Sequence, residues 1–249
     1  MPSSILIPIL VEAGFTLIAA QVTAFAITMV ASSIISKAFF SPEQPSGDLS
    51  GNSPNLGNRQ QVPPATSNKL PVVYGSAWVG GTIVDMSISE NNQEIYYVMA
   101  LSEVTNNGGD VITFGDIYYG GKLVTFKPDG YTVASLTDES TGVVDTTVAD
   151  KIQIYLYSNG SYSPYNSSTN AISVMSASGL TYTWDNTKLM TNCAFAIIHL
   201  TYSQTANVRG IEQTRFQINN ARTQVGDCIY DYLTNTVYGA AIPASQVDT

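Results

Sequence analysis

The stretch "NKLPVVYGSAWVGGTIVDMS" (residues 68–87) decides how the fold begins, although it contains no cysteine, no histidine and no pair of carboxylates. One apolar run ends on Tyr74-Gly75, and a second run is broken by Gly80-Gly81. β-Branched and aromatic residues favour strands, whereas glycine favours tight turns. The stretch therefore predicts two short strands joined by a tight turn, a hairpin that acts as scaffold rather than as a site of chemistry.

The same strand-like pattern continues through residues 70–249 and predicts a mainly β region. Alternating apolar and polar residues, separated by glycine-rich turns, are typical of antiparallel strands. We expect an antiparallel sandwich or a barrel-like domain with one short helix near the C-terminus. Further strand-like segments are 94–101, 111–126, 151–162, 193–202 and 211–218, with glycine-rich turns at "NNGGD" and at "YYGG" within 111–126.

Two of these segments carry a sharper prediction. Ile152, Ile154 and Leu156 alternate with polar or tyrosine residues, and Asn159-Gly160 is a hairpin signal. The segment 193–202, "CAFAIIHLTY", is apolar on both faces, as in a strand at the centre of a sheet. The segments 138–150 and 165–178 are expected to be surface loops.

The segment 226–235, "GDCIYDYLTN", predicts the helix near the C-terminus. Asp227 is the expected N-cap. The residues Cys228, Ile229, Tyr232 and Leu233 fall on one side of this helix.

The first 40 residues predict a long apolar helix, because Glu12 and Lys37 are the only charges between residues 5 and 40. A second pattern is a stripe of small residues at every fourth position, which lets another helix approach closely. The stripe consists of Thr16, Ala20, Ala24, Thr28, Ser32 and Ser36, and the other side carries Ile18, Val22, Phe25, Met29 and Ile35. Insertion into lipid and packing inside an assembly both remain open. Residues 41–69 are rich in proline and predict an extended arm or linker.

The composition points away from chemistry and from nucleic-acid binding. Charged residues make up 12% of the chain, the net charge is −9, and no basic patch occurs. No P-loop, metal-binding or catalytic-triad pattern is found, so we expect no enzyme, no metal and no cofactor. Cys193, Cys228 and the single histidine, His199, are expected to be core residues, and a disulfide between the cysteines stays open.

Two segments together resemble the protein J family, the tail-tip hub and host-specificity proteins of long-tailed bacteriophages. The first is "VPPATSNKLPVVYGSAWVGGTIVDMS", and the second is "CIYDYLTNTVYGAAIPASQVD" (228–248). The positions that carry the resemblance are Pro71, Val72, Tyr74, Gly75, Trp78, Gly80, Gly81, Asp231, Tyr232, Leu233, Tyr238, Gly239, Ile242 and Pro243.

The resemblance implies a structural protein of the virion that forms a homotrimeric hub at the distal tip of the tail. Such a hub contacts the distal tail protein, the tape-measure protein and the tail fibre or receptor-binding proteins, and DNA passes it only as cargo during ejection. It also serves in attachment to the bacterial envelope. Family members are longer, so residues 70–249 are expected to continue into a longer protein. The alternative is a membrane-anchored surface or adhesion protein with a β ectodomain.

Overall fold

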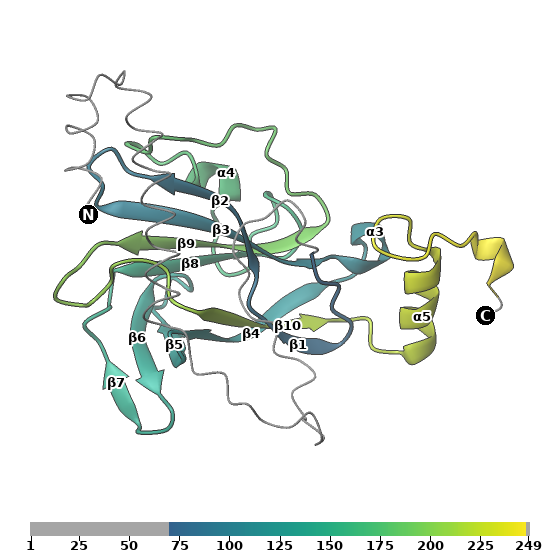
Figure 1. Ribbon diagram of the computed structural model, residues 1–249, viewed down its shortest axis with the longest axis horizontal. Helices are drawn as coiled ribbons and strands as arrows, with labels where there is room; N and C mark the ends of the chain where they lie inside the picture. Colours follow the sequence, from purple (N-terminus) through teal and green to yellow (C-terminus); the bar gives the residue numbers. More distant parts are fainter. Residues whose placement is uncertain (1–69, 248–249) are drawn as a thin grey trace, which may run out of the picture. The chain divides into compact units, whose positions relative to one another are not determined.

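The strands of residues 70–247, the part that the computed structural model describes, form two antiparallel sheets (Figure 1). In the six-stranded sheet the order is β1 (Ser76–Val79), β10 (Thr214–Asn220), β4 (Ile112–Tyr119), β5 (Lys122–Phe126), β6 (Val133–Asp138) and β7 (Val143–Asp145). In the four-stranded sheet it is β2 (Thr82–Ile88), β3 (Glu94–Glu103), β9 (Cys193–Thr201) and β8 (Ile152–Tyr157). The mainly β, antiparallel prediction is confirmed.

The two sheets share one apolar core. Phe216 and Ile218 of β10 belong to the same buried cluster as Met99 of β3 and Ile154 of β8. The expected barrel closure is wrong for residues 70–247, because β1 and β7 form the two edges of one sheet and β2 and β8 those of the other. The twist of each sheet is accommodated by packing one sheet on the other rather than by closing either one.

The four-stranded sheet is buried on both faces. Its second face packs against the segment between β8 and β9, which contains the short helix α4 (Ala171–Val174). As a result every residue of β9 from Cys193 to Leu200 is buried, and β9 lies between β3 and β8. The sequence prediction of a central strand at 193–202 is therefore confirmed.

Two loop predictions are wrong, and one turn prediction is confirmed. The segment 138–150 contains β7, which pairs with β6, so this region is a hairpin. The segment 165–178 contributes Ala171 and Met175, both fully buried, to the second core. The turn signal at Asn159-Gly160 is confirmed: the chain reverses there and Pro164 makes an antiparallel bridge to Tyr157, but no strand follows, and the segment covers the sheet before it returns as β9.

The opening stretch is not a hairpin. β1 pairs with β10 in one sheet, whereas β2 pairs with β3 in the other. Residues 70–75 form no strand, and Val72 makes only an isolated bridge to Glu103. Gly80-Gly81 is thus the crossing from one sheet to the other. Gly81 has a φ of +70°, and a Cβ there would lie 2.7 Å from Cδ2 of Leu101.

The one helix longer than a single turn in residues 70–247 is α5 (Val225–Thr234), as the sequence predicts to within one residue. The predicted cap is wrong, because Gln224 holds the N-cap position and its side chain makes no capping bond. Asp227 lies in the first turn, where a carboxylate is favoured by the helix dipole. A short turn α3 (Thr105–Gly108) and a 3-10 turn η1 (Ala244–Gln246) complete the elements.

The predictions for the apolar helix of residues 1–40, its stripe of small residues and the arm 41–69 lie outside the described residues. Between residues 70 and 247 no helix has the length and apolarity needed to cross a membrane.

Candidate functional site

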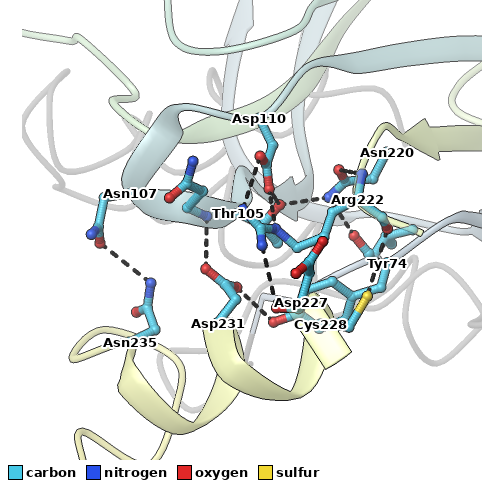
Figure 2. A network of polar contacts seen from close by, with 12 residues as sticks. Tyr74, Thr105, Asn107, Asp110, Asn220, Arg222, Asp227, Cys228, Asp231 and Asn235 are labelled. Atoms are coloured by element: carbon cyan, nitrogen blue, oxygen red, sulfur yellow. Dashed lines mark hydrogen bonds and ion pairs between the residues drawn. The ribbon is translucent and has the colours of Figure 1, made fainter. Parts of the chain in front are cut away.

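The two segments that carry the family resemblance meet at the carboxylate of Asp231. The hydroxyl of Tyr74 donates a hydrogen bond of 2.7 Å to Oδ2 of Asp231, although the two residues are 157 positions apart. The hydroxyl of Tyr238 donates to the same oxygen, also at 2.7 Å. The backbone N–H of Asn106 donates to Oδ1 at 3.0 Å. Asp231 is only 6% exposed, so this carboxylate fastens α5 to the β region (Figure 2).

A second polar contact fixes the chain just before α5. The guanidinium of Arg222 forms an ion pair with Asp110, with Nε 2.6 Å from Oδ2 and Nη2 3.2 Å from Oδ1. Both side chains are mostly buried, with exposed fractions of 16% and 14%. The Nη1 group of Arg222 also donates to the backbone oxygen of Asp227, in the first turn of α5. One arginine therefore joins the sheet to the start of the helix.

The chain at the end of β10 aligns these groups. Asn220 is buried, and its Nδ2 donates to the backbone oxygen of Val73 and to Oγ1 of Thr105, both at 2.7 Å. Its Oδ1 accepts from the backbone N–H of Arg222 at 2.9 Å. The hydroxyl of Thr105 in turn donates to Asp110. These bonds form one connected network from residue 73 to the helix (Figure 2).

The turn α3 faces α5 in an unusual backbone conformation. Asn106 and Asn107 have φ angles of 55° and 50°, in the left-handed region, which asparagine tolerates better than most residues. This conformation lets the N–H of Asn106 reach Asp231, while Oδ1 of Asn107 accepts from Nδ2 of Asn235 at 3.3 Å. The backbone shape of α3 is thus matched to the side of α5 that it contacts.

The segment after α5 folds back on the helix and satisfies its last carbonyl groups. The N–H groups of Ala240 and Ile242 donate to the carbonyl oxygens of Tyr232 and Leu233 at 2.9 and 2.8 Å. Gly239 passes so close that a Cβ there would lie 2.0 Å from the Tyr232 oxygen. Glycine at this motif position is therefore required by contact, because any side chain would displace the returning segment.

Burial governs the titration of the groups around Asp231. Burial and the hydrogen bond to Asp231 raise the pKa of Tyr74 and of Tyr238 above the ordinary range of tyrosine. Burial alone would raise the pKa of Asp110, but hydrogen bonds from Arg222 and Thr105 outweigh it and hold that pKa below its ordinary value. At neutral pH the two tyrosines are therefore donors and Asp110 is an acceptor.

The remaining motif positions have local roles away from Asp231. The backbone oxygen of Pro71 accepts from the N–H of Glu103, and the N–H of Gly75 donates to the oxygen of Arg222. Trp78 packs edge-on against Tyr118 with 5.3 Å between ring centroids. Leu233 and Ile242 are half-buried, whereas Tyr232 and Pro243 are exposed. Tyr74, Asp231, Tyr238 and Gly239 are the motif residues that the fold brings together around α5.

The sequence-based analysis missed Thr105, Asn106, Asp110, Asn220 and Arg222. Each is an ordinary polar residue in its own segment, and only the pairing of β4 with β10 brings them together. The "NNGG" run at 106–109 was the one local signal, since asparagine and glycine tolerate positive φ.

The single histidine and the two cysteines are the other residues considered for chemistry. His199 is 9% exposed and stacks on Tyr96 at 4.0 Å, and its Nδ1 lies 3.1 Å from Oε1 of Gln153. Burial lowers the pKa of His199. Cys193 and Cys228 are both free thiols. Cys193 is buried, as predicted, and burial raises its pKa to about 12. The prediction for Cys228 is wrong, because this residue is only half-buried on α5. Within residues 70–247 no group of three or more histidine, cysteine, aspartate or glutamate side chains is placed to hold a metal ion.

Comparison of the chain with protein-family models gives no match, and comparison with curated proteins gives none either.

Proposed function

We propose that this protein is a structural component of a bacteriophage tail tip, a hub that closes the distal end of the tail tube. In this role it contacts the tape-measure protein and the distal tail protein and serves in host attachment and DNA delivery. The role needs stable surfaces rather than reactive groups.

The observation that carries the proposal is the meeting of the two family-like segments. The segments that resemble the hub family lie at opposite ends of the β region, yet Tyr74 and Tyr238 donate to the same carboxylate, Asp231. Each segment alone is a weak resemblance to the family. The resemblance is strengthened because the two segments contact each other in the fold. The contact also explains why tyrosine, aspartate and glycine are needed there.

The composition supports the same role. With a net charge of −9 the protein has a surface that repels phosphate groups, which suits a channel that DNA must pass without binding. Tyrosine is abundant, with 15 residues, and charged residues are few, as in proteins with large permanent interfaces. Closed symmetric assemblies are the usual form of such parts, and a trimer is proposed here.

The test is the copy number of this protein in isolated tails. Quantitative mass spectrometry with isotope-labelled reference peptides from residues 94–103 and 214–222, compared with the copy number of the tail-tube protein, gives the stoichiometry. Three copies per tail support the hub. One copy, six copies or absence from purified particles overturns it.

A mutation tests the place of the N-terminal segment in the assembly. Ala24→Leu keeps the segment apolar and helix-favouring but fills the stripe of small residues, and such overpacking typically costs about 1–3 kcal/mol per site. We expect Ala24→Leu to give defective tails and Ile18→Leu, on the other side, to be tolerated. Wild-type tail yields from both variants would contradict packing through the stripe.

A further inference from the structure

His199 lies on the outer face of the four-stranded sheet, next to the second core. Along β9 it follows Ile197 by two positions, so both side chains point to the same face of the sheet. In the register of the strands it is opposite Tyr96 of β3 and Gln153 of β8. Its ring stacks on Tyr96 with 4.0 Å between ring centroids and 9° between ring planes. Tyr96 belongs to the second core, so the imidazole is in contact with it.

One ring nitrogen of His199 has a defined hydrogen bond. Nδ1 lies 3.1 Å from Oε1 of Gln153, and the hydroxyl of Tyr155 donates to the same oxygen at 2.7 Å. A carbonyl oxygen only accepts, and it has lone pairs for two hydrogen bonds. Nδ1 therefore carries the hydrogen, and in the neutral ring Nε2 has the lone pair.

The other ring nitrogen is buried without a hydrogen bond. Nε2 of His199 is shielded from solvent and has no hydrogen-bond partner among residues 70–247. Oε2 of Glu94, at the start of β3, lies 3.4 Å from it, and a carboxylate also only accepts. Two acceptors therefore face each other. A proton on Nε2 would convert this contact into an ion pair between an imidazolium and a carboxylate.

The tyrosines that contact His199 and Gln153 keep their hydroxyl protons between about pH 5 and 8. Burial raises the pKa of Tyr96 to about 12, and it raises the pKa of Tyr155 above the ordinary range of tyrosine. Tyr155 therefore remains a donor to Gln153 over this range. Further charged or titratable groups near this face are Lys151 before β8, Asp129 and Tyr131 before β6, and Tyr182 of the covering segment.

We propose that His199 and Glu94 form a proton-binding pair that makes the packing of the four-stranded sheet sensitive to acid. At neutral pH the ring is uncharged and has its hydrogen on Nδ1. On acidification Nε2 takes up one proton and pairs with Oε2 of Glu94, which places a charge beside the second core. The proposal does not depend on the tail function, because it concerns three strands of one chain.

The surroundings of the two groups decide the direction of the effect. The side chain of His199 is 11% exposed, and burial lowers its pKa because it disfavours the charged ring. The carboxylate of Glu94 opposes this shift, but its side chain is 40% exposed, so solvent weakens the attraction. The folded chain therefore binds the proton less readily than the unfolded chain, whose histidine pKa is about 6.5.

The sign of the pH dependence follows from this difference. The contribution of the uncharged ring to stability is fully present above about pH 6.5. It is lost as pH falls from there through the lowered pKa of folded His199. Over that interval one proton changes the unfolding equilibrium constant by up to about tenfold per pH unit.

The test is NMR of the tag-free full chain labelled with ¹⁵N-histidine, in which His199 is the single histidine. We expect a neutral ring with its hydrogen on Nδ1 at about pH 7.5 and a titration midpoint below about 6.5. Glu94→Gln keeps the shape but removes the opposing charge, and should lower the midpoint by about 0.5–1 pH unit. Glu139→Gln, which removes the same charge from an exposed turn of the other sheet, should leave it unchanged.

The second measurement is unfolding in urea at about pH 7.5 and about pH 5. His199→Gln removes the titrating ring and keeps a side chain that can donate to Gln153. The unfolding constant at the lower pH, divided by that at the higher pH, should be about threefold or more smaller in His199→Gln than in the wild type. Because each protein is compared with itself, the constant cost of the substitution cancels.

Three results would overturn the proposal. A hydrogen on Nε2 of His199 at about pH 7.5 would show that this nitrogen already donates to Glu94. A midpoint at or above about 6.5, or one that Glu94→Gln does not change, would show that the two groups do not share the proton in this way. Equal unfolding ratios in the wild type and His199→Gln would show that the proton does not affect packing. If His199→Gln does not fold, the titrations of the wild type and Glu94→Gln decide alone.

Discussion

Replacing Asp231 by alanine should detach helix α5 from the β region while the two sheets stay folded. The carboxylate accepts from the hydroxyls of Tyr74 and Tyr238 and from the N–H of Asn106. Asp231 is the buried residue of α5, whereas Cys228, Tyr230 and Leu233 are half-buried. The three contacts to Asp231 are therefore the contacts that its most buried side chain makes with the β region.

The size of the effect follows from these three hydrogen bonds. Hydrogen bonds to a charged group contribute about 1.5–3 kcal/mol each, so the gross loss is about 5–9 kcal/mol. Two terms reduce it. Burying the carboxylate itself costs several kcal/mol, and the half-buried hydroxyls of Tyr74 and Tyr238 can turn to water in the variant. We expect a net loss of about 2–4 kcal/mol in the free energy of docking α5.

Hydrogen exchange of the α5 amides, measured by mass spectrometry on peptides from 223–236, reports this free energy directly. Each 1.4 kcal/mol is a factor of ten, so exchange should accelerate about 30-fold or more. Asp227→Ala is the matched control, since it removes the same charge from an exposed position of the same helix. Rates for Asp231→Ala within threefold of that control, or equal acceleration in β3 and β9, would refute a local polar attachment.

Three further predictions follow from the geometry. Gly81→Ala should lower the free energy of unfolding by about 2–3 kcal/mol in urea titrations, whereas Gly121→Ala, with similar positive φ but open space, should cost about 1 kcal/mol; equal losses would exclude the close contact at Gly81. The pKa values of Tyr74 and Tyr238 are raised in the folded state, so their contribution holds below the ordinary tyrosine pKa of about 10 and is lost as pH rises beyond it. Exchange protection of α5 should therefore fall above about pH 10, and protection that persists unchanged would contradict these shifts. Met175→Ala should cost about 2–5 kcal/mol of unfolding free energy, because Met175 is fully buried, and a loss below 1 kcal/mol would mean that the segment over the four-stranded sheet is not part of the core.

Local patterns predicted individual strands well. The alternation at Ile152, Ile154 and Leu156 identified β8, and the apolarity of 193–202 on both faces identified β9 as a central strand. These features depend only on which faces of a strand are buried. Helix α5 was predicted for the same reason, since its periodicity is local.

Pairing between distant segments could not be read in this way. The opening stretch has the composition of a hairpin, but whether two adjacent strands pair with each other or with distant partners is decided by the whole sheet. The turn at Asn159-Gly160 was predicted correctly, and a single antiparallel bridge joins Pro164 to Tyr157 beyond it. The local signal could not tell that the returning segment forms no strand and instead covers the outer face of the four-stranded sheet.

The site around Asp231 was partly predicted. The resemblance singled out Tyr74, Asp231 and Tyr238. It did not predict that the two tyrosine hydroxyls donate to the carboxylate of Asp231. The analysis placed Ile229 and Tyr232 on one side of the helix without showing that this side faces outward. Helical periodicity predicts which residues lie on the same side of a helix. It does not predict which side packs against the sheets.

The pairing of β1 with β10 also sets the order in which this protein can be made. Ser76 lies opposite Asn219, 143 positions later in the chain (219 − 76), so the six-stranded sheet cannot gain its outer strand until β10 has been synthesised. Ribosomes add about 5–20 residues per second, and the wait is therefore about 7–30 s. Contacts between such distant residues also slow folding after release from the ribosome. During this interval β1 and β4 both lack the strand that pairs with them, so their backbone N–H and C=O groups are open to pairing with other strands.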